Sequence, residues 1–278
     1  MIGWHVSPCS CIFEVQEFKE VQFKPVGSAR MEAVFFCHGM PGSKADATLL
    51  RKANPNVDIV AIDLLAYAPE DADVALANAL HSKAIAADKG GVVLAGFSIG
   101  AMAAIKIAAK RPDIVSRLIL ISPAAPLSMG NFLPDMAGKP VFKLAKSHPK
   151  LLRLLTVFQG LMTRWSPERT AGALFRNCGA PERALFEDPD FQNGLNQAFV
   201  ECFLRRPDAY LAFINAYVTD WSETIDLVQC PVELWHGTND TWSPPEMSHA
   251  LAKRFGEKAT LRMVEQAEHY STMNQVTL

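Results

Sequence analysis

The chain has 278 residues, of which 49% are hydrophobic and 20% are charged, and its formal net charge is −2 at pH 7. This length and composition suit one large globular domain that carries an insertion. A net charge so close to zero gives no indication of binding to nucleic acid or to an anionic membrane surface.

The N-terminus has no sign of export or of membrane insertion. Its first residues, MIGWHVSPCSC, lack both the basic start and the apolar stretch of a secretory signal. No run approaches the ~18 uninterrupted apolar residues of a membrane span. The cysteines are scattered and not spaced as a disulfide framework. We therefore expect a cytoplasmic protein without a membrane span, either a monomer or a homodimer.

Seven segments have the pattern of β-strands. From about residue 12, the stretch CIFEVQEFKEVQF alternates apolar and polar side chains, as a half-exposed antiparallel strand does. The other six are short apolar runs typical of buried parallel strands: 32–39, 57–64, 91–96, 117–123, 232–237 and 259–265. The last of these is more mixed, so we expect it nearer an edge of the sheet.

Helical patterns lie between several of these runs, at roughly 71–87, 99–110 and 244–255. Such alternation predicts an α/β fold with a mostly parallel, doubly wound sheet covered on both faces. Residues 126–222 break the alternation, because they contain helical patterns separated by Pro and Gly and no convincing strand. We predict a core formed by residues 1–125 and 223–278, with residues 126–222 inserted as a helical cap.

The large apolar residues of the predicted cap are expected to build mainly a small core of its own, with some of them facing the sheet. They are Phe132, Phe142, Leu152, Phe158, Trp165, Phe175 and Phe213.

A serine stands between two glycines where a predicted strand becomes a predicted helix, in Gly96-Phe97-Ser98-Ile99-Gly100. A sharp turn at this point strains the backbone and projects the hydroxyl out of the sheet. We expect glycine at both flanking positions because bulky side chains there would crowd each other. The helix N-terminus beside Ser98 favours negative charge. The alternative is a Gly-Ser turn without a catalytic role.

A glycine-rich bend, His38-Gly39-Met40-Pro41-Gly42, follows the apolar run at 32–39. Acyl transfer needs two backbone donors for the oxyanion that develops on the carbonyl oxygen. We predict the N–H groups of Met40 and Ile99 as these donors, since Pro41 has none. His38, at a strand end, is interpreted as structural.

Two further residues complete a possible catalytic set. Asp240 follows a strand-like run in WHGTNDTWSP, where its carboxylate can orient an imidazole, although a simple Asx turn or helix cap is the alternative. Of the two histidines after Asp240, His249 lies in a helical pattern, whereas His269 follows a strand and can reach the serine. We predict Ser98 as nucleophile, His269 as base and Asp240 as its partner. Phe97 and Trp242 are predicted pocket residues.

Together these motifs resemble the α/β-hydrolase superfamily over about residues 12–275. The stretch Gly96–Gly100 matches its nucleophile elbow, and His38–Gly42 matches the HG-x-PG form of its oxyanion loop. Asp240 within HGTND and His269 within AEHYS match its acid and base. The resemblance implies an eight-stranded, mostly parallel sheet, a helical cap after the sixth strand, and chemistry without a metal or cofactor.

The chain departs from the pattern at one place. After VAIDL many relatives with this oxyanion loop carry a glycine-rich D-x-x-G-x-G-x-S run, whereas this chain has DLLAYAPED, so the local loop must differ and Asp63 is interpreted as structural. The resemblance also disfavours haloalkane dehalogenases and epoxide hydrolases of this fold, which use a carboxylate nucleophile where this chain has Ser98.

The expected function is hydrolysis of an ester, thioester or related acyl bond in a small to medium, partly apolar molecule. Hydrolysis of a carbon–carbon bond, opening of a lactone or a lyase reaction are alternatives for the same three residues. A non-catalytic ligand-binding protein that keeps the fold is an alternative of a different class.

Overall fold

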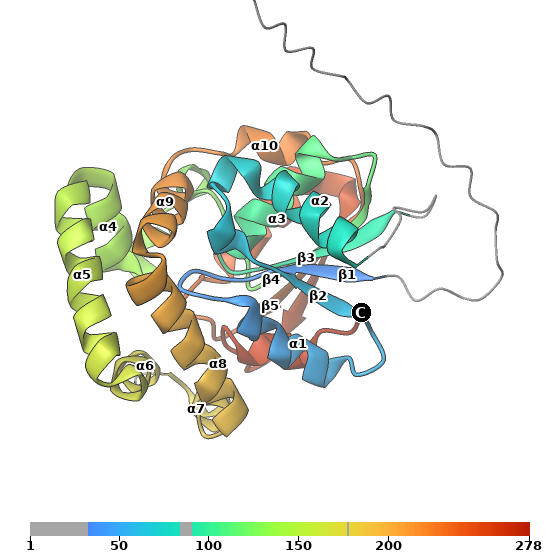
Figure 1. Ribbon diagram of the computed structural model, residues 1–278. Helices are drawn as coiled ribbons and strands as arrows, with labels where there is room; N and C mark the ends of the chain where they lie inside the picture. Colours follow the sequence, from blue (N-terminus) through green and yellow to red (C-terminus); the bar gives the residue numbers. More distant parts are fainter. Residues whose placement is uncertain (1–32, 84–90, 177) are drawn as a thin grey trace, which may run out of the picture. The chain divides into compact units, whose positions relative to one another are not determined.

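The computed structural model describes residues 33–83, 91–176 and 178–278. Six strands form one sheet in the order β2-β1-β3-β4-β5-β6, and every neighbouring pair is parallel (Figure 1). The strands are β1 (Val34–Cys37), β2 (Ile59–Ile62), β3 (Val92–Phe97), β4 (Val115–Ile121), β5 (Val232–Gly237) and β6 (Ala259–Val264).

These strands coincide with the six predicted apolar runs, and the mixed run does form the edge strand β6. The expected count of eight strands is wrong, because the described residues form a sheet of six. The strand predicted from about residue 12, in CIFEVQEFKEVQF, lies outside the described residues. The eighth strand was implied by resemblance alone, and no further apolar run in the sequence corresponds to it. Among the described strands the long helical segment follows the fourth, whereas the resemblance places it after the sixth strand of the complete sheet.

Helices cover both faces of the sheet. On one side lie α2 (Ala72–Ser82), α3 (Gly100–Lys110) and α10 (Glu223–Asp226), and on the other lies α1 (Ala47–Ala53), which contacts the final turn η8 (Ser271–Gln275) (Figure 1). The helix α11 (Glu246–Phe255) packs on β5, β6 and α10. The alanine-rich helix α3 is almost wholly buried, because small side chains let it lie close to β1, β3 and β4.

Residues 126–222, which we call the helical segment, contain no strand in their described part. The helices are α4 (Lys139–Ser147), α5 (Pro149–Trp165), α6 (Pro167–Phe175), α7 (Ala180–Phe186), α8 (Pro189–Phe199), the π-helical turn η6 (Val200–Arg205) and α9 (Pro207–Val218). Four of them begin at a proline, whose fixed φ suits the first helical position and whose missing N–H costs nothing there. Among the described residues no helix is long and apolar enough to cross a membrane.

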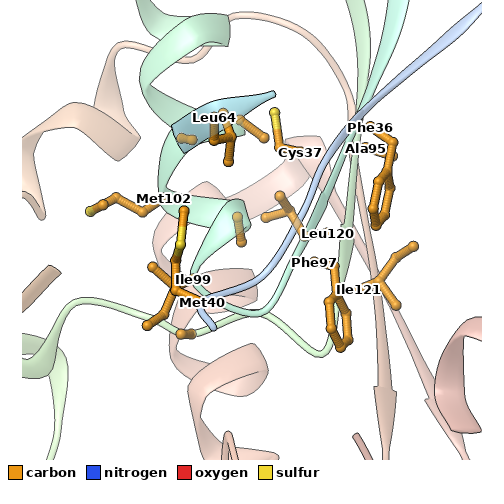
Figure 2. Packing of buried hydrophobic residues seen from close by; sticks show 14 of the residues in the cluster. Phe36, Cys37, Met40, Leu64, Ala95, Phe97, Ile99, Met102, Leu120 and Ile121 are labelled. Atoms are coloured by element: carbon orange, nitrogen blue, oxygen red, sulfur yellow. The ribbon is translucent and has the colours of Figure 1, made fainter. Parts of the chain in front are cut away.

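The hydrophobic core extends from the strands into the helical segment. Phe35, Phe36 and Leu94 are fully buried in the sheet, and Figure 2 shows how side chains from β1, β3, β4 and the loops that follow them pack together. Most large apolar residues of the helical segment are buried as expected. Phe158 and Trp165 are not, since they are 57% and 79% exposed on α5.

The junction between β3 and α3 leaves no room for side chains at its two glycines. A Cβ on Gly96 would lie 2.8 Å from the Cα of Ala101 and 2.9 Å from the carbonyl oxygen of Gly100. A side chain at position 96 would therefore crowd position 100, as predicted. Gly100 is limited differently, because its Cβ would lie 2.3 Å from the carbonyl oxygen of His38 and 2.4 Å from that of Cys37. The start of α3 therefore rests directly on the backbone that leaves β1.

We predict that Gly100→Ala lowers the free energy of unfolding by roughly 1–3 kcal/mol, because the new methyl group forces β1 and α3 apart. Gly172→Ala on α6 is the matched control, since its Cβ would meet only Phe186, at 3.7 Å, and alanine favours a helix over glycine. Urea denaturation of both variants measures the difference. Equal stability of the Gly100→Ala and wild-type proteins would contradict the close packing.

Candidate active site

Ser98 occupies a strained turn directly after β3. Its φ of 55° lies in the left-handed region, which is uncommon for a residue other than glycine. Its N–H donates to the carbonyl of Ile121 at 3.0 Å, and its own carbonyl accepts from the N–H groups of Ala101 and Ala124, each at 3.1 Å. These bonds to the next strand and to α3 hold the conformation that aims the side chain away from the sheet.

Asp240 and His269 form a buried pair at the carboxyl ends of β5 and β6. The Nδ1 atom of His269 lies 2.8 Å from Oδ2 of Asp240, and the two residues are 2% and 4% exposed. The other carboxylate oxygen, Oδ1, accepts from the N–H groups of Trp242 and Ser243 at 2.8 and 3.0 Å. The Asx turn considered as an alternative is therefore present as well, and it orients the oxygen that meets His269.

A second histidine, His236, also contacts Asp240. Its Nε2 lies 2.7 Å from the carbonyl oxygen of Ser243 and 3.2 Å from Oδ2 of Asp240. Because a carbonyl only accepts, Nε2 carries a proton, and Nδ1 lies 2.6 Å from the hydroxyl oxygen of Ser248. Burial acts to raise the pKa of Asp240, but His269 and His236 outweigh it and hold the pKa well below its usual range. Asp240 therefore remains ionised.

The imidazole of His269 packs against two aromatic rings. Its centroid is 4.7 Å from that of Phe97, the residue before the serine, and Trp242 stacks on it at 5.4 Å with an interplanar angle of 17°. The hydroxyl of Ser122 holds this loop by donating to the carbonyl of His269 at 2.9 Å. Within the described residues, no hydrogen bond joins the Ser98 hydroxyl to the ring of His269.

The bend after β1 is held by a buried carboxylate. Asp46 accepts from the N–H groups of Gly39 and Ser43, each at 3.3 Å, and burial raises its pKa to about 7 against these hydrogen bonds. The thiol of Cys202, on η6, contacts the backbone of Gly42 at 3.3 to 3.4 Å. The bend is therefore held by Asp46 of the core and by Cys202 of the helical segment.

The backbone donors of Met40 and Ile99 are unused. In the described part of the chain, neither N–H group meets a hydrogen-bond acceptor, although the two residues are 7% and 2% exposed. Buried N–H groups of proteins are nearly always paired. Two unpaired donors on residues that line the same cavity as Ser98 therefore fit a site that binds an oxygen atom carrying negative charge.

A cavity of about 390 Å³ opens beside these groups, and its walls are mainly apolar. Met40, Ser98, Ile99 and Trp242 line it, whereas the ring of Phe97 is not among its lining residues and packs on His269 and Tyr270. The helical segment supplies most of the remaining wall, including Met136, Val141, Phe142, Phe158, Phe199 and Tyr210. This volume is in the range of sites for small molecules.

Glu182 on α7 connects the helical segment to the loop of His269. Its buried carboxylate accepts from the N–H groups of Tyr270 and Ser271, the latter at 2.8 Å. Burial raises the pKa of Glu182 to about 7, although the two hydrogen bonds and the nearby His269 act to lower it. This side chain thus fixes the residues directly after His269.

The structure brings Asp240 and His269 together, and it places Ser98, Met40 and Ile99 around one cavity. His38 is fully buried, with Nε2 accepting from the N–H of Leu64 at 3.2 Å, and burial lowers its pKa to about 4. His249 is exposed on α11. Sequence reasoning missed His236, Asp46 and Glu182. Only His236, four residues before Asp240 in the same motif, carried a local signal.

The loop after β2, where many relatives carry a glycine-rich run, has a different structure in this chain, as expected. The segment DLLAYAPED forms two short 3-10 turns, Leu64–Ala66 and Pro69–Asp71, that lead into α2. Leu64 and Leu65 are buried there, and Asp63 pairs with Arg206 of the helical segment at 2.8 Å.

Comparison with known proteins identifies the family. Residues 34–275 match the model of the alpha/beta hydrolase family, so the chain belongs to that family. A search of curated protein sequences found no match.

Solved structures with the same fold include several esterases. A thermophilic esterase from Thermogutta terrifontis is 19% identical, with a TM-score of 0.54 over 88% of this chain and 85% of the other. A structure from a study of carboxylesterases of Nitrososphaera gargenis is 16% identical, with a TM-score of 0.56 over 90% and 88%. Est816, described as an N-acyl homoserine lactone degrading enzyme, is 14% identical, with a TM-score of 0.58 over 88% of each chain.

The raised pKa of Glu182 predicts a pH dependence of stability. Between about pH 4.5 and 7 the folded protein keeps a proton on Glu182 that the unfolded chain releases, so the contribution of this group to the unfolding free energy falls as pH rises through that window. We expect the unfolding free energy of Glu182→Gln to fall less steeply with pH than that of the wild type. Urea denaturation across this window measures both slopes.

The exposed Glu187, at the end of the same helix, provides the control. Glu187→Gln keeps the wild-type slope, because this side chain is exposed to water and lacks the burial that Glu182 has. Identical slopes for the Glu182→Gln and wild-type proteins would show that burial does not shift this group.

Proposed function

We propose that this member of the alpha/beta hydrolase family is a serine hydrolase that cleaves an ester, thioester or related acyl bond. Ser98 attacks the carbonyl carbon, His269 takes the hydroxyl proton and passes it to the leaving group, and water then releases the acid from the acyl-enzyme. The chemistry needs no metal or cofactor.

The observation that carries this proposal is the pair of unpaired N–H groups beside a serine at positive φ, all three on residues that line one cavity. Met40 and Ile99 would hold the developing oxyanion, while the charge of Asp240 would stabilise the imidazolium that forms. In the neutral imidazole whose Nδ1–H donates to Asp240, Nε2 carries a lone pair that can accept the proton from Ser98.

The substrate we propose is a small to medium molecule with an apolar acyl or aryl group. The apolar walls of the 390 Å³ cavity support this, as does the position of Trp242 over His269. We also propose that residues 126–222 act as a cap, since their side chains form most of the cavity wall above Ser98.

We predict that Ser98→Ala lowers kcat by about 10⁴-fold or more, since a triad that acts as a unit loses most of its catalysis with any member. The assay uses p-nitrophenyl esters of increasing acyl length, with thioesters alongside. Ser128→Ala is the matched control, because its hydroxyl only bonds Asp220 near the surface. Near wild-type hydrolysis by Ser98→Ala would exclude this mechanism.

Labelling by a serine-directed fluorophosphonate separates the enzyme from a non-catalytic binding protein of the same fold. We expect the wild type to be labelled and Ser98→Ala to remain unlabelled. A wild-type protein that is folded but unreactive would favour the non-catalytic alternative.

Lactones form a second candidate substrate class. The similarity to Est816, described as degrading N-acyl homoserine lactones, favours their inclusion, because lactone opening uses the same attack on an ester carbonyl. Comparison of kcat/KM for lactones and linear esters of equal carbon number decides between the two classes.

A further inference from the structure

The helix α5 exposes the side that a helix of a globular protein normally buries. Its large apolar residues Leu151, Leu154, Phe158, Leu161 and Trp165 follow the spacing of one helix face and are 48% to 79% exposed. Val157 and Met162 widen the same face. Seven of the eleven exposed large hydrophobic residues in the described chain lie on this one helix.

The buried side of α5 explains why the helix is oriented in this way. Its inward residues include Thr156, Gly160 and Thr163, which are small. A Cβ on Gly160 would lie 2.6 Å from the carbonyl oxygen of Phe203, so α5 and η6 are too close for any larger residue. Only the face of α5 with small residues can therefore pack against η6, and the large apolar side chains remain on the exposed face.

Basic residues are concentrated on α5 and on the two helices that flank it in the sequence, α4 and α6. Residues 139–169 contain seven Lys and Arg residues against the single acid Glu168, a net charge of +6 in a chain whose total is −2. Six of the seven are exposed, and only Arg153 has an ion-pair partner among the described residues, Asp208 at 2.8 Å. The basic residues are Lys139, Lys143, Lys146, Lys150, Arg153, Arg164 and Arg169. The near-zero total charge conceals this local excess.

We propose that the apolar face of α5 docks on a lipid surface that carries anionic headgroups. An apolar stripe with Trp and Leu, bordered by Lys and Arg, is the pattern by which helices lie in the plane of a bilayer interface. Phe158 and Met162 belong to this face and also line the cavity of Ser98, so the docked surface adjoins the entrance to the cavity. A symmetric contact with a second copy fits less well, because it would bring the cations at the two ends of α5 together.

Vesicle sedimentation of the Ser98→Ala protein tests the docking without any hydrolysis, so its outcome is independent of the proposed function. We expect the protein to bind vesicles of equal parts phosphatidylglycerol and phosphatidylcholine, and to bind pure phosphatidylcholine much more weakly. The emission of Trp165 shifts to shorter wavelength on binding, and Trp165→Phe removes that shift. Lys146→Gln with Arg164→Gln lowers the partition coefficient by about five-fold for each cation.

Leu154→Ser with Trp165→Ser lowers the partition coefficient at least about 30-fold, because two exposed anchors are lost. Val74→Ser with Leu227→Ser is the control, since these residues are also exposed large hydrophobics but lie away from α5, so their loss leaves binding unchanged. Failure to bind anionic vesicles overturns the proposal. A dimer in sedimentation velocity that Leu154→Ser with Trp165→Ser dissociates also overturns it, and assigns the face to a second copy.

Discussion

The backbone turn at Ser98 is the constraint on which the rest of the site depends. A non-glycine residue at positive φ costs of the order of 1–3 kcal/mol, so the conformation persists only where neighbours hold it. Here β4 and α3 hold it through hydrogen bonds from and to the backbone of Ser98. The same turn starts α3, whose first residue, Gly100, rests on the backbone leaving β1. The contact between Gly100 and the backbone leaving β1 therefore determines the position of Ser98 and of the bend that carries Met40.

The helical segment stabilises the site as well as enclosing it. Glu182 binds the backbone after His269, and Cys202 contacts the bend after β1. Both loops of the candidate site therefore depend on side chains that lie far from them in sequence. The carboxylates Asp46 and Glu182 each anchor a loop from a buried position. Burial away from water raises the pKa of both.

The helix α5 shows how one packing contact can determine a surface. Its apolar periodicity is that of any amphipathic helix, and its large residues are of the kind that normally build a core. Because Gly160 meets the backbone of Phe203, the helix turns its small residues inward and Trp165 outward. The exposed apolar face is thus a consequence of close approach at η6, and the basic residues on α4, α5 and α6 determine what kind of surface can cover it.

The six strands of the sheet, their parallel arrangement and the positions of Ser98, Asp240 and His269 after strand ends could all be predicted from the sequence. These features depend on local runs of apolar residues and on short motifs, so they can be read without knowledge of the neighbours. The tertiary structure alone decided the roles of Glu182, Asp46 and His236 and the outward face of α5. Each depends on which groups meet across the fold. The burial of a side chain and the shift of its pKa therefore cannot be predicted from its neighbours in the sequence.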